Sequence, residues 1–348
     1  MSEASPHLHA GVQAGDQPLV QVSDLRVVVR GADGPVTILH GIDFSLHAGR
    51  VLCVLGESGS GKSMTMRALM RLVPRSATIE GRVVIDGVDV LTLPERALTD
   101  IRGSLVSMIF QEPATALDPT FTIGHQIAET VRAHDGASWA DARRRALDLL
   151  ELVQVPSAAR RLQAYPHELS GGLRQRAMIA LALSCRPKVL IADEPTTALD
   201  ATVQIQVLLL LRELQRELGM ATLFVTHDVG VACEIADEVA VMYAGRIVEH
   251  GTTEEVLGRP GHPYARGLLR SVVTSELVGT RLEPIKGSPP DLSALPPGCS
   301  FAPRCGHALE RCAVATPGLA PLSPTHLVRC VRSGELEPIP DHAQEVTS

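Results

Sequence analysis

The first 70 residues alternate short apolar runs with polar turns. Runs of strand type lie at Leu25–Val29, Asp43–Leu46 and Val51–Leu55, and glycine and histidine separate them. They predict a β-rich beginning of the domain, because short apolar stretches bounded by turn residues are typical of strands. The pattern changes to helical spacing at Ser63–Leu72, which predicts a helix soon after the third run.

From residue 122 to residue 184 the apolar positions have mainly helical spacing. One helical face is formed by Ile123, Ile127 and Val131. A second face is formed by Trp139, Ala142, Ala146, Leu149 and Val153. Leu173–Leu183 has the spacing of a third helix. We therefore expect an inserted helical subdomain at about residues 112–180.

Three more apolar runs predict buried strands at Leu105–Phe110, Val189–Ala192 and Ala221–Val225, with a long helical pattern between the last two. Alternation of strands and helices favours a parallel sheet covered by helices. The sequence thus predicts an α/β fold.

The two ends of the chain have a different character. Residues 1–18 are small and polar and are expected to be disordered. Residues 287–340 contain ten prolines and little periodicity. We divide the chain into this N-terminal tail, a main domain at residues 19–260 and a C-terminal extension at residues 261–348.

Composition narrows the function. The 348 residues carry a net charge of -7, whereas a nucleic-acid-binding surface normally needs a basic excess, so we expect no nucleic-acid partner. No run of 18 apolar residues occurs, and the first 20 residues lack lysine, arginine and an apolar core. We expect neither a membrane span nor a secretory signal. We therefore expect the chain to stay in the cytoplasm. If it serves transport, another chain must form the path through the membrane.

Glycine and serine crowd the loop Gly56-Glu-Ser-Gly-Ser-Gly-Lys62-Ser63, between a predicted strand and a predicted helix. This is the context of a phosphate-binding loop, in which backbone N–H groups and the helix N-terminus face the anion. Lys62 would reach the β- and γ-phosphates, and Ser63 would bind Mg²⁺. A glycine-serine loop with a chance lysine is the alternative. The predicted nucleotide-binding residues here are Gly56, Ser58, Gly59, Ser60, Gly61, Lys62 and Ser63.

Two further segments suit phosphate chemistry. Asp193 and Glu194 follow an apolar run; Asp193 suits a place behind the direct ligands of Mg²⁺, and Glu194 suits a general base that polarises water. An ordinary acidic turn is the alternative. Ser170-Gly171-Gly172 precedes a predicted helix, where a hydroxyl and N–H groups can bind an anion. Taken alone, these three residues favour a plain N-cap.

Together, these segments resemble the ATP-binding cassette (ABC) family, the ATPases of ABC transporters. They occur in the family's order: Gly56–Ser63, Gln111, Leu169–Gly172, Val189–Glu194 and His227. The resemblance covers roughly residues 19–340. It implies a P-loop NTPase (RecA-like) parallel-sheet core with an N-terminal antiparallel β subdomain, an inserted helical subdomain and a small irregular cysteine-rich C-terminal extension.

The resemblance implies roles that spacing alone does not give. Gln111 is similar to the Q-loop residue, which senses Mg²⁺ and water and links the ATP site to the permease. His227 is similar to the switch histidine at the γ-phosphate, and Thr197-Ala198-Leu199-Asp200 is similar to the D-loop of the dimer interface. Two ATPase chains would dock head to tail, with each ATP between the loop of one chain and Ser170–Gly172 of the other. The expected catalytic residues are Glu194, His227 and Gln111, the expected Mg²⁺ site is Ser63, Gln111 and Asp193, and further ATP contacts are Asp193, Ser170, Gly171, Gly172 and Asp200.

One position departs from the family pattern. The family usually stacks an aromatic side chain on adenine from the early strand near Val29. This chain has Leu25-Arg-Val-Val-Val29 there, and no Phe, Tyr or Trp occurs before Phe44. We expect weak selection of adenine over other bases.

Two segments narrow the resemblance to oligopeptide/dipeptide importer ATPases. They are Gln111–Pro119, with Ala114 where those proteins typically have Met, and His262–Leu269, followed by Pro284–Pro290 and a cysteine-bearing tail. This implies an ATP-hydrolysing subunit of a bacterial importer of di- or oligopeptides, at the cytoplasmic face of the inner membrane. Its partners would be a second ATPase subunit, two transmembrane permeases and, indirectly, an extracytoplasmic solute-binding protein. An importer of nickel or another small solute and a soluble, non-transport ABC ATPase are the alternatives.

Seven cysteines fall into two groups. Cys53, Cys185 and Cys233 lie among apolar residues and are expected core thiols. Cys299, Cys305, Cys312 and Cys330 crowd the tail with spacings C-x₅-C, C-x₆-C and C-x₁₇-C. They predict a metal centre, either zinc or a [4Fe–4S] cluster, and the absence of close C-x₂-C pairs disfavours zinc. Peptide importers with a similar tail carry such a cluster, which favours iron–sulfur. Four free thiols, or a redox or metal sensor of the ATPase, are the alternatives.

Overall fold

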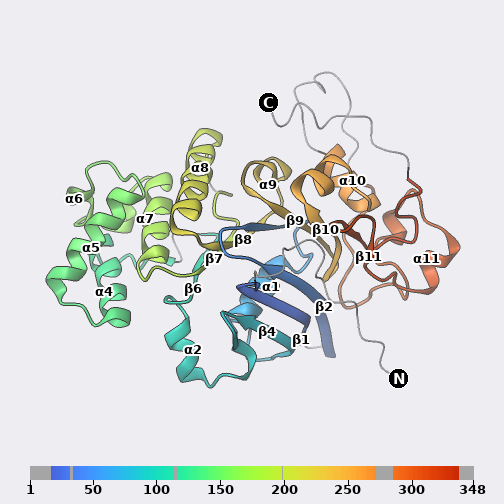
Figure 1. The fold of residues 1–348 in the computed structure, drawn as a ribbon, viewed down its shortest axis with the longest axis horizontal. Coiled ribbons are helices and arrows are strands. Elements are labelled where there is room, and N and C mark those ends of the chain that lie inside the picture. The colour runs from blue at the N-terminus through green and yellow to red at the C-terminus, as the bar shows by residue number, and fades with distance from the viewer. Residues whose placement is uncertain (1–16, 32–33, 113–115, 198, 272–284, 337–348) are drawn as a thin grey trace. The chain divides into compact units, whose positions relative to one another are not determined.

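The computed structural model describes residues 17–31, 34–112, 116–197, 199–271 and 285–336 (Figure 1). Several predictions fall partly outside these residues: most of the N-terminal tail, Ala114 after Gln111, Ala198 of the expected D-loop, and Pro284. The predicted domain boundaries stay predictions.

The chain divides into two compact units. The first contains the described residues up to His47, then Val51–Leu91, and those from Val225 on. The second contains Ala48–Arg50 and Thr92–Phe224.

An antiparallel sheet opens the first unit, with strand order β2-β1-β4-β5. Its strands are β1 (Val20–Gly31), β2 (Gly34–Leu46), β4 (Ala77–Ile85) and β5 (Val88–Asp89). Val20 and Val22 of β1 are buried, as alternation along a strand requires. A register shift between Val22 and Leu25 then moves burial to Leu25 and Val27, because an inserted residue reverses the faces that follow it.

A second set of strands in the first unit has the order β11-β12-β10-β9-β3. β3 (Val51–Leu55) is buried along its whole length and pairs in parallel with β9 (Glu238–Tyr243). The next pairs are antiparallel, and their strands are β10 (Arg246–Thr252), β12 (Leu327–Val328) and β11 (Ala320–Pro321). The helices of this unit are α1 (Lys62–Leu69), α9 (Val229–Ile235), α10 (Pro263–Arg270) and α11 (Glu310–Val314), with short turns η1 (Val90–Thr92), η3 (Glu254–Gly258) and η5 (Ala302–Arg304).

The second unit contains strands in the order β8-β7-β6. These are β6 (Val106–Ile109), β7 (Val189–Asp193) and β8 (Ala221–Thr226), whose last two residues belong to the first unit. β6 and β7 pair in parallel. The helices are α2 (Glu95–Ile101), α4 (Ile123–Asp135), α5 (Trp139–Leu152), α6 (Ala158–Arg161), α7 (Gly171–Leu183) and α8 (Ala201–Leu218), with a short turn η2 (Pro166–Glu168).

The buried face of α5 differs in part from the predicted one. Ala142, Ala146 and Leu150 are buried, whereas Leu149 is only half-buried. Trp139 is 40% exposed, because it is the first residue of the helix and its ring stacks on His125 instead of entering the core.

No helix within the described part of the chain is long and apolar enough to cross a membrane.

Polar contacts anchor the C-terminal extension. Glu249 of β10 is fully buried, and its carboxylate accepts hydrogen bonds from the backbone N–H groups of Gly261 and His262, at 2.7 and 2.8 Å. The Nε2 atom of His326 lies 2.6 Å from the same carboxylate. A nearby carboxylate, that of Glu255, accepts from the hydroxyls of Ser323 and Thr325. Residues 320–328 are thus fixed by side chains of β10 and η3.

Candidate functional site

The predicted phosphate-binding loop lies between β3 and α1 in the first unit. The side chain of Lys62 is buried, and its ammonium donates to the carbonyl oxygens of Gly56 and Glu57, at 2.7 and 2.9 Å. The two carbonyls thus hold the ammonium at the loop, where a phosphate would compete with them for it.

Backbone contacts from β9 and β10 set the shape of the loop. A Cβ atom at Gly56 would meet the carbonyl oxygen of Met242 at 2.3 Å, so only glycine fits. The N–H of Gly245 donates to the carbonyl of Ser60 at 2.8 Å. Gly61 has φ of 104°, a region that favours glycine. The hydroxyl oxygen of Ser60 is buried without a hydrogen-bond partner, which fits a site built for an incoming polar ligand.

The two helices expected to face phosphate begin without a side-chain cap. Their N-caps are Gly61 for α1 and Ser170 for α7, and α2 and α6 also lack such a cap. The N-cap side chains of five other helices accept from backbone N–H groups; these are Thr122, Ser138, Asp200, Asp228 and His262. A helix start without a side-chain cap leaves its N–H groups to an anion, which the helix dipole also favours.

Gln111 and Glu194 meet in the second unit. Ile109 of β6 pairs with Ala192 of β7, and each predicted site residue follows its paired residue by two positions. Parallel register therefore brings both to the same end of the strands. The amide Nε2 of Gln111 donates to Oε2 of Glu194 at 3.2 Å, and the hydroxyl of Thr197 donates to the same oxygen at 3.0 Å. Asp193, the last residue of β7, directly precedes Glu194 in sequence and is buried.

The backbone of Glu194 is strained. Its φ is 45°, in the left-handed region that costs a non-glycine residue of order 1–3 kcal/mol. Such strain is typical of functional positions.

The Ser170–Gly172 segment lies beside the expected D-loop. A Cβ at Gly172 would meet a methyl group of Val203 at 2.6 Å, and one at Gly171 would lie 3.7 Å from Leu199. Glycine thus permits close packing of α7 on the start of α8. The carboxylate of Asp200 caps α8 by accepting from the N–H of Val203 at 3.0 Å.

His227 follows β8 in the first unit and is exposed. The turn around it is fixed, because the hydroxyl of Thr226 accepts from the N–H of Asp228 and Asp228 caps α9. The structure therefore places residues 56–63 and His227 in the first unit. The remaining predicted ATP-site residues lie in the second unit, namely Gln111, Ser170, Gly171, Gly172, Asp193, Glu194 and Asp200.

Sequence reasoning missed a set of contacts at Glu57. The backbone N–H of Glu57 donates to the hydroxyl of Tyr264 at 2.8 Å, and its carboxylate pairs with Arg304 at 2.7 and 3.0 Å. Nothing in the sequence around Tyr264 or Arg304 points to Glu57, because the contacts join residues 207 and 247 positions apart.

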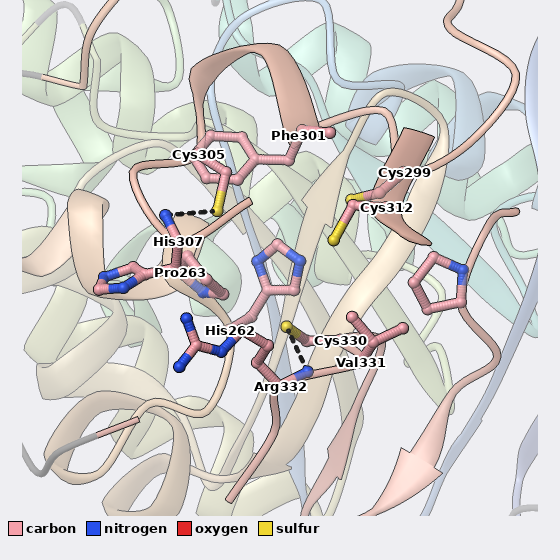
Figure 2. A pocket seen from close by; sticks show the side chains of 12 residues that line it. His262, Pro263, Cys299, Phe301, Cys305, His307, Cys312, Cys330, Val331 and Arg332 are labelled. Atoms are coloured by element: carbon pink, nitrogen blue, oxygen red, sulfur yellow. Dashed lines mark hydrogen bonds between the residues drawn. The ribbon is translucent and has the colours of Figure 1, made fainter. Parts of the chain in front are cut away.

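The four tail cysteines line one cavity (Figure 2). Cys305, Cys312 and Cys330 each accept a backbone N–H on Sγ at 3.4 Å. Figure 2 shows the side chains arranged around the ring of His262, which also lines the cavity. Nδ1 of His262 accepts from the N–H of Tyr264 at 3.0 Å, so a neutral ring carries its proton on Nε2.

Burial raises the pKa of the thiols of Cys299, Cys305 and Cys330. Burial also lowers the pKa of His262 to about 3, and Arg329 adds to this effect. Within the described ranges, no three or more His, Cys, Asp and Glu side chains are grouped so that they could hold a metal ion. Of the three expected core thiols, Cys53 is buried and Cys185 and Cys233 are half-buried.

Comparison with known proteins supplies the class. A family model described as ABC transporter matches residues 39–197, and one described as oligopeptide/dipeptide transporter, C-terminal region, matches residues 248–312. A solved dimeric, post-hydrolysis structure of the ATP-binding cassette MJ0796 bound to ADP and Pi has a TM-score of 0.61 and 28% identity. The match covers 67% of this chain and 98% of that one. Fold and sequence segments together define an ABC-type ATPase, which hydrolyses ATP.

Two curated relatives narrow the class. This chain is 48% identical to the oligopeptide transport ATP-binding protein OppD of Salmonella typhimurium (strain LT2), over 91% of this chain and 94% of the relative. It is 44% identical to the dipeptide transport ATP-binding protein DppD of Bacillus subtilis (strain 168), over 90% and 94%. The chain therefore belongs to the oligopeptide/dipeptide family of ABC transporter ATPases. The family, the α/β P-loop fold with its antiparallel β subdomain, and the ATPase activity predicted from the sequence are confirmed.

Proposed function

We propose that this chain powers the uptake of di- or oligopeptides through partner permeases, by binding and hydrolysing ATP at residues 56–63 and at the segments after β6 and β7. The observation that carries the proposal is the loop itself: a buried lysine ammonium held between backbone carbonyls, next to an uncapped helix start. Such a loop suits the phosphates of a nucleotide.

Lys62 would bind the β- and γ-phosphates, and Ser63 would hold Mg²⁺ with support from Gln111 and Asp193. Mg²⁺ would neutralise phosphate charge. Glu194 would polarise the attacking water as general base, and the hydrogen bond from Gln111 supports its orientation. His227 would contact the γ-phosphate, as the resemblance implies.

Glu194→Gln tests the catalytic role. The variant keeps the shape of the side chain and one acceptor oxygen but removes the base. Turnover should fall roughly 10²-fold or more, while ATP binding is kept. Glu151→Gln, the same change at an exposed glutamate of α5, is the matched control and should retain the turnover. Hydrolysis at the wild-type rate by Glu194→Gln would reject Glu194 as the base.

We also propose that two such ATPase chains, identical or paralogous, dock head to tail on two permease subunits at the cytoplasmic face of the inner membrane. Each ATP would then contact Ser170, Gly171 and Gly172 of the partner chain. In a mixed dimer, Ser170→Arg should inactivate the site that contains the other chain's Lys62. Inactivation only of the site that contains the mutant's own Lys62 would contradict this arrangement.

Peptides are the proposed cargo because the similarity to peptide-transport ATP-binding proteins extends over nine-tenths of the chain. Nickel or another small solute is the second candidate. Uptake of labelled di- and oligopeptides and of nickel by cells with and without this chain separates the two. Loss of nickel uptake alone would overturn the peptide assignment.

We further propose that Cys299, Cys305, Cys312 and Cys330 hold a [4Fe–4S] cluster. One lined cavity and backbone N–H donors to sulfur suit a cluster. The cysteine spacings lack the close C-x₂-C pairs common in zinc sites, which disfavours a single zinc ion. When bound, the cluster would brace a segment that has little apolar core.

Metal analysis tests this assignment. Protein purified without oxygen should be brown and contain about four irons per chain. Cys312→Ser should lose the iron, whereas Cys53→Ser, a buried cysteine outside the cavity, should keep it. One zinc per chain, or four thiols that are all alkylated in the native protein, would reject the cluster.

A further inference from the structure

Glu57 is held at every polar group that it has. Its carbonyl oxygen accepts from the ammonium of Lys62 and from the N–H of Ser60, at 2.9 and 3.2 Å. Its N–H donates to the hydroxyl of Tyr264, and its carboxylate receives two hydrogen bonds from Arg304. The first two contacts lie inside the loop at residues 56–63. The others come from α10 and from the cysteine-bearing segment, more than 200 positions away in sequence.

Arg304 has no freedom to shift at this contact. Its side chain is only 6% exposed. Besides Glu57, its guanidinium donates to the carbonyls of Lys286 and Gly287, at 2.9 and 3.3 Å, and to the hydroxyl of Tyr243 at 3.4 Å. A guanidinium whose N–H groups are all engaged in hydrogen bonds holds a carboxylate in one orientation, because its donors lie in a fixed plane. An ammonium group lacks this fixed geometry.

Aromatic side chains pack around Tyr264 and Arg304. The ring of Tyr264 lies 4.6 Å from that of Tyr243 and 5.4 Å from that of Phe301. Phe301 also packs edge-on against Tyr243 at 5.2 Å. The hydroxyl of Tyr264 and the guanidinium of Arg304 are therefore presented to Glu57 by one rigid cluster.

Each contact to Glu57 also adjoins the cysteine cavity. Cys305 follows Arg304 directly, and His262 stands two residues before Tyr264 and donates no proton through Nδ1, which accepts from the N–H of Tyr264. Cys305, His262 and Phe301 all line the cavity. A change in the packing of that cavity can therefore move Arg304 through its neighbour Cys305, and Tyr264 through the nearby His262. Both residues contact Glu57.

We propose that Arg304 and Tyr264 are positioning residues of the nucleotide site: by fixing Glu57 they preorganise the phosphate-binding loop, and they couple the C-terminal cysteine region to nucleotide affinity. The proposal rests on the proposed function of the loop as the phosphate site. A preformed anion site binds more tightly than a mobile one, because less conformational freedom is lost on binding. Coupling between two sites is reciprocal, so nucleotide bound at the loop should also stabilise the packing of the cysteine region.

Nucleotide affinity is the first measurement, by titration with Mg²⁺ and a non-hydrolysable ATP analogue. Arg304→Ala should raise Kd about 5- to 50-fold, the usual range of coupling between sites, with kcat changed much less than KM. Arg304→Lys should recover only part of the affinity, and Tyr264→Phe should show a smaller loss. Glu57→Ala combined with Arg304→Ala should bind no worse than the weaker single variant, since both remove one contact.

Arg259→Ala is the matched control. This arginine side chain is 75% exposed and pairs with Glu254 at 3.6 Å. It should leave Kd unchanged even if it lowers thermal stability. If Arg304→Ala fails to fold, as judged by circular dichroism, Arg304→Lys and Tyr264→Phe decide the question.

Backbone protection is the second measurement. The ATP analogue with Mg²⁺ should slow hydrogen–deuterium exchange of the backbone N–H groups of residues 299–312 in the unmodified protein, and Arg304→Ala should abolish that protection. Lys62→Ala separates the two hypotheses. If Lys62→Ala loses binding while the Arg304 and Tyr264 variants bind normally, the coupling is wrong and the phosphate site stands. If Lys62→Ala binds normally, the proposed phosphate site itself fails. Losses that multiply in the Glu57 and Arg304 double variant would also overturn the coupling.

Discussion

Residues 56–63 and residues 285–336 belong to the same unit, but different kinds of contact hold them. The loop at 56–63 is shaped by main chain: glycines stand where the carbonyls of Met242 and Ile38 leave no room for a Cβ at Gly56 and Gly245. The segment at 285–336 is shaped by polar side chains, with Glu249 and Glu255 at its anchors.

The difference shows how much each region tolerates. A loop shaped by close backbone contacts fails through steric overlap, at positions where only glycine fits. A segment held by carboxylates and hydroxyls fails through loss of an acceptor, or through a change of protonation. Glu57 joins the two, because its carbonyl belongs to the first kind of contact and its carboxylate to the second.

The largest expected loss of stability comes from removing one of the buried carboxylates that anchor residues 285–336. Glu249→Ala leaves His326 and the N–H groups of Gly261 and His262 without their buried acceptor. We expect a loss of about 3–5 kcal/mol in the free energy of unfolding, measured with urea. Glu254→Ala, whose side chain is 84% exposed, should cost almost nothing. A loss below about 1 kcal/mol for Glu249→Ala would show that other contacts hold the extension.

The next largest expected loss comes from adding a Cβ atom at a glycine that contacts the main chain closely. Gly245 has φ of 72°, and an added Cβ would meet the carbonyl oxygen of Ile38 at 2.1 Å. Gly87 has φ of 79° with nothing within 4 Å. Gly87→Ala should therefore cost about 1–2 kcal/mol for backbone strain alone. Gly245→Ala should cost about 1–3 kcal/mol more from overpacking. Equal losses in thermal or urea unfolding would mean that the carbonyl moves aside.

The pH dependence of stability tests the region of β10 that anchors residues 285–336. Burial, with a smaller effect of His326, lowers the pKa of His250 to about 4, from the usual histidine value of about 6.5. Below pH 6.5 the unfolded chain then binds a proton that the folded chain excludes, so stability falls as pH drops toward 4. For this group alone the loss between pH 7 and pH 5 is about 2 kcal/mol. His250→Asn should flatten the urea-derived stability profile over that range. An unchanged slope would assign the acid sensitivity elsewhere.

The smallest effect concerns the base of the nucleotide, on which neither kind of contact bears. Val29 of β1 is only half-buried, and no aromatic side chain precedes Phe44. Val29→Tyr should tighten ATP binding by about 0.5–1.5 kcal/mol, the usual worth of an aromatic pair beyond burial. It should also increase the preference for ATP over GTP in competition titrations. Unchanged affinity would mean that Val29 does not neighbour adenine.

Local sequence predicted what neighbouring residues dictate. Strand, glycine loop and helix around Lys62 follow from spacing, and the strands that carry Gln111 and Glu194 follow from short apolar runs. The buried side of α5 was predicted only in part, because Trp139 finds its partner in His125 of another helix.

Long-range geometry could not be predicted in the same way. Glu57 and Arg304 stand 247 positions apart, and no pattern within either segment points to the other. The positive φ of Glu194 also has no signature in the sequence, since the turn after β7 is set by packing of the surrounding strands and helices. The ABC resemblance gave roles to these segments, but the contacts that orient them came from the fold.

The backbone at Glu194 places chemistry and folding in conflict. Its φ of 45° suits glycine or asparagine far better than glutamate. Asparagine there would relax the main chain and raise the melting temperature, yet it would remove the proposed base. Selection for heat resistance alone would therefore drift toward inactive variants at this position, and an assay of turnover is needed beside any screen for thermostability.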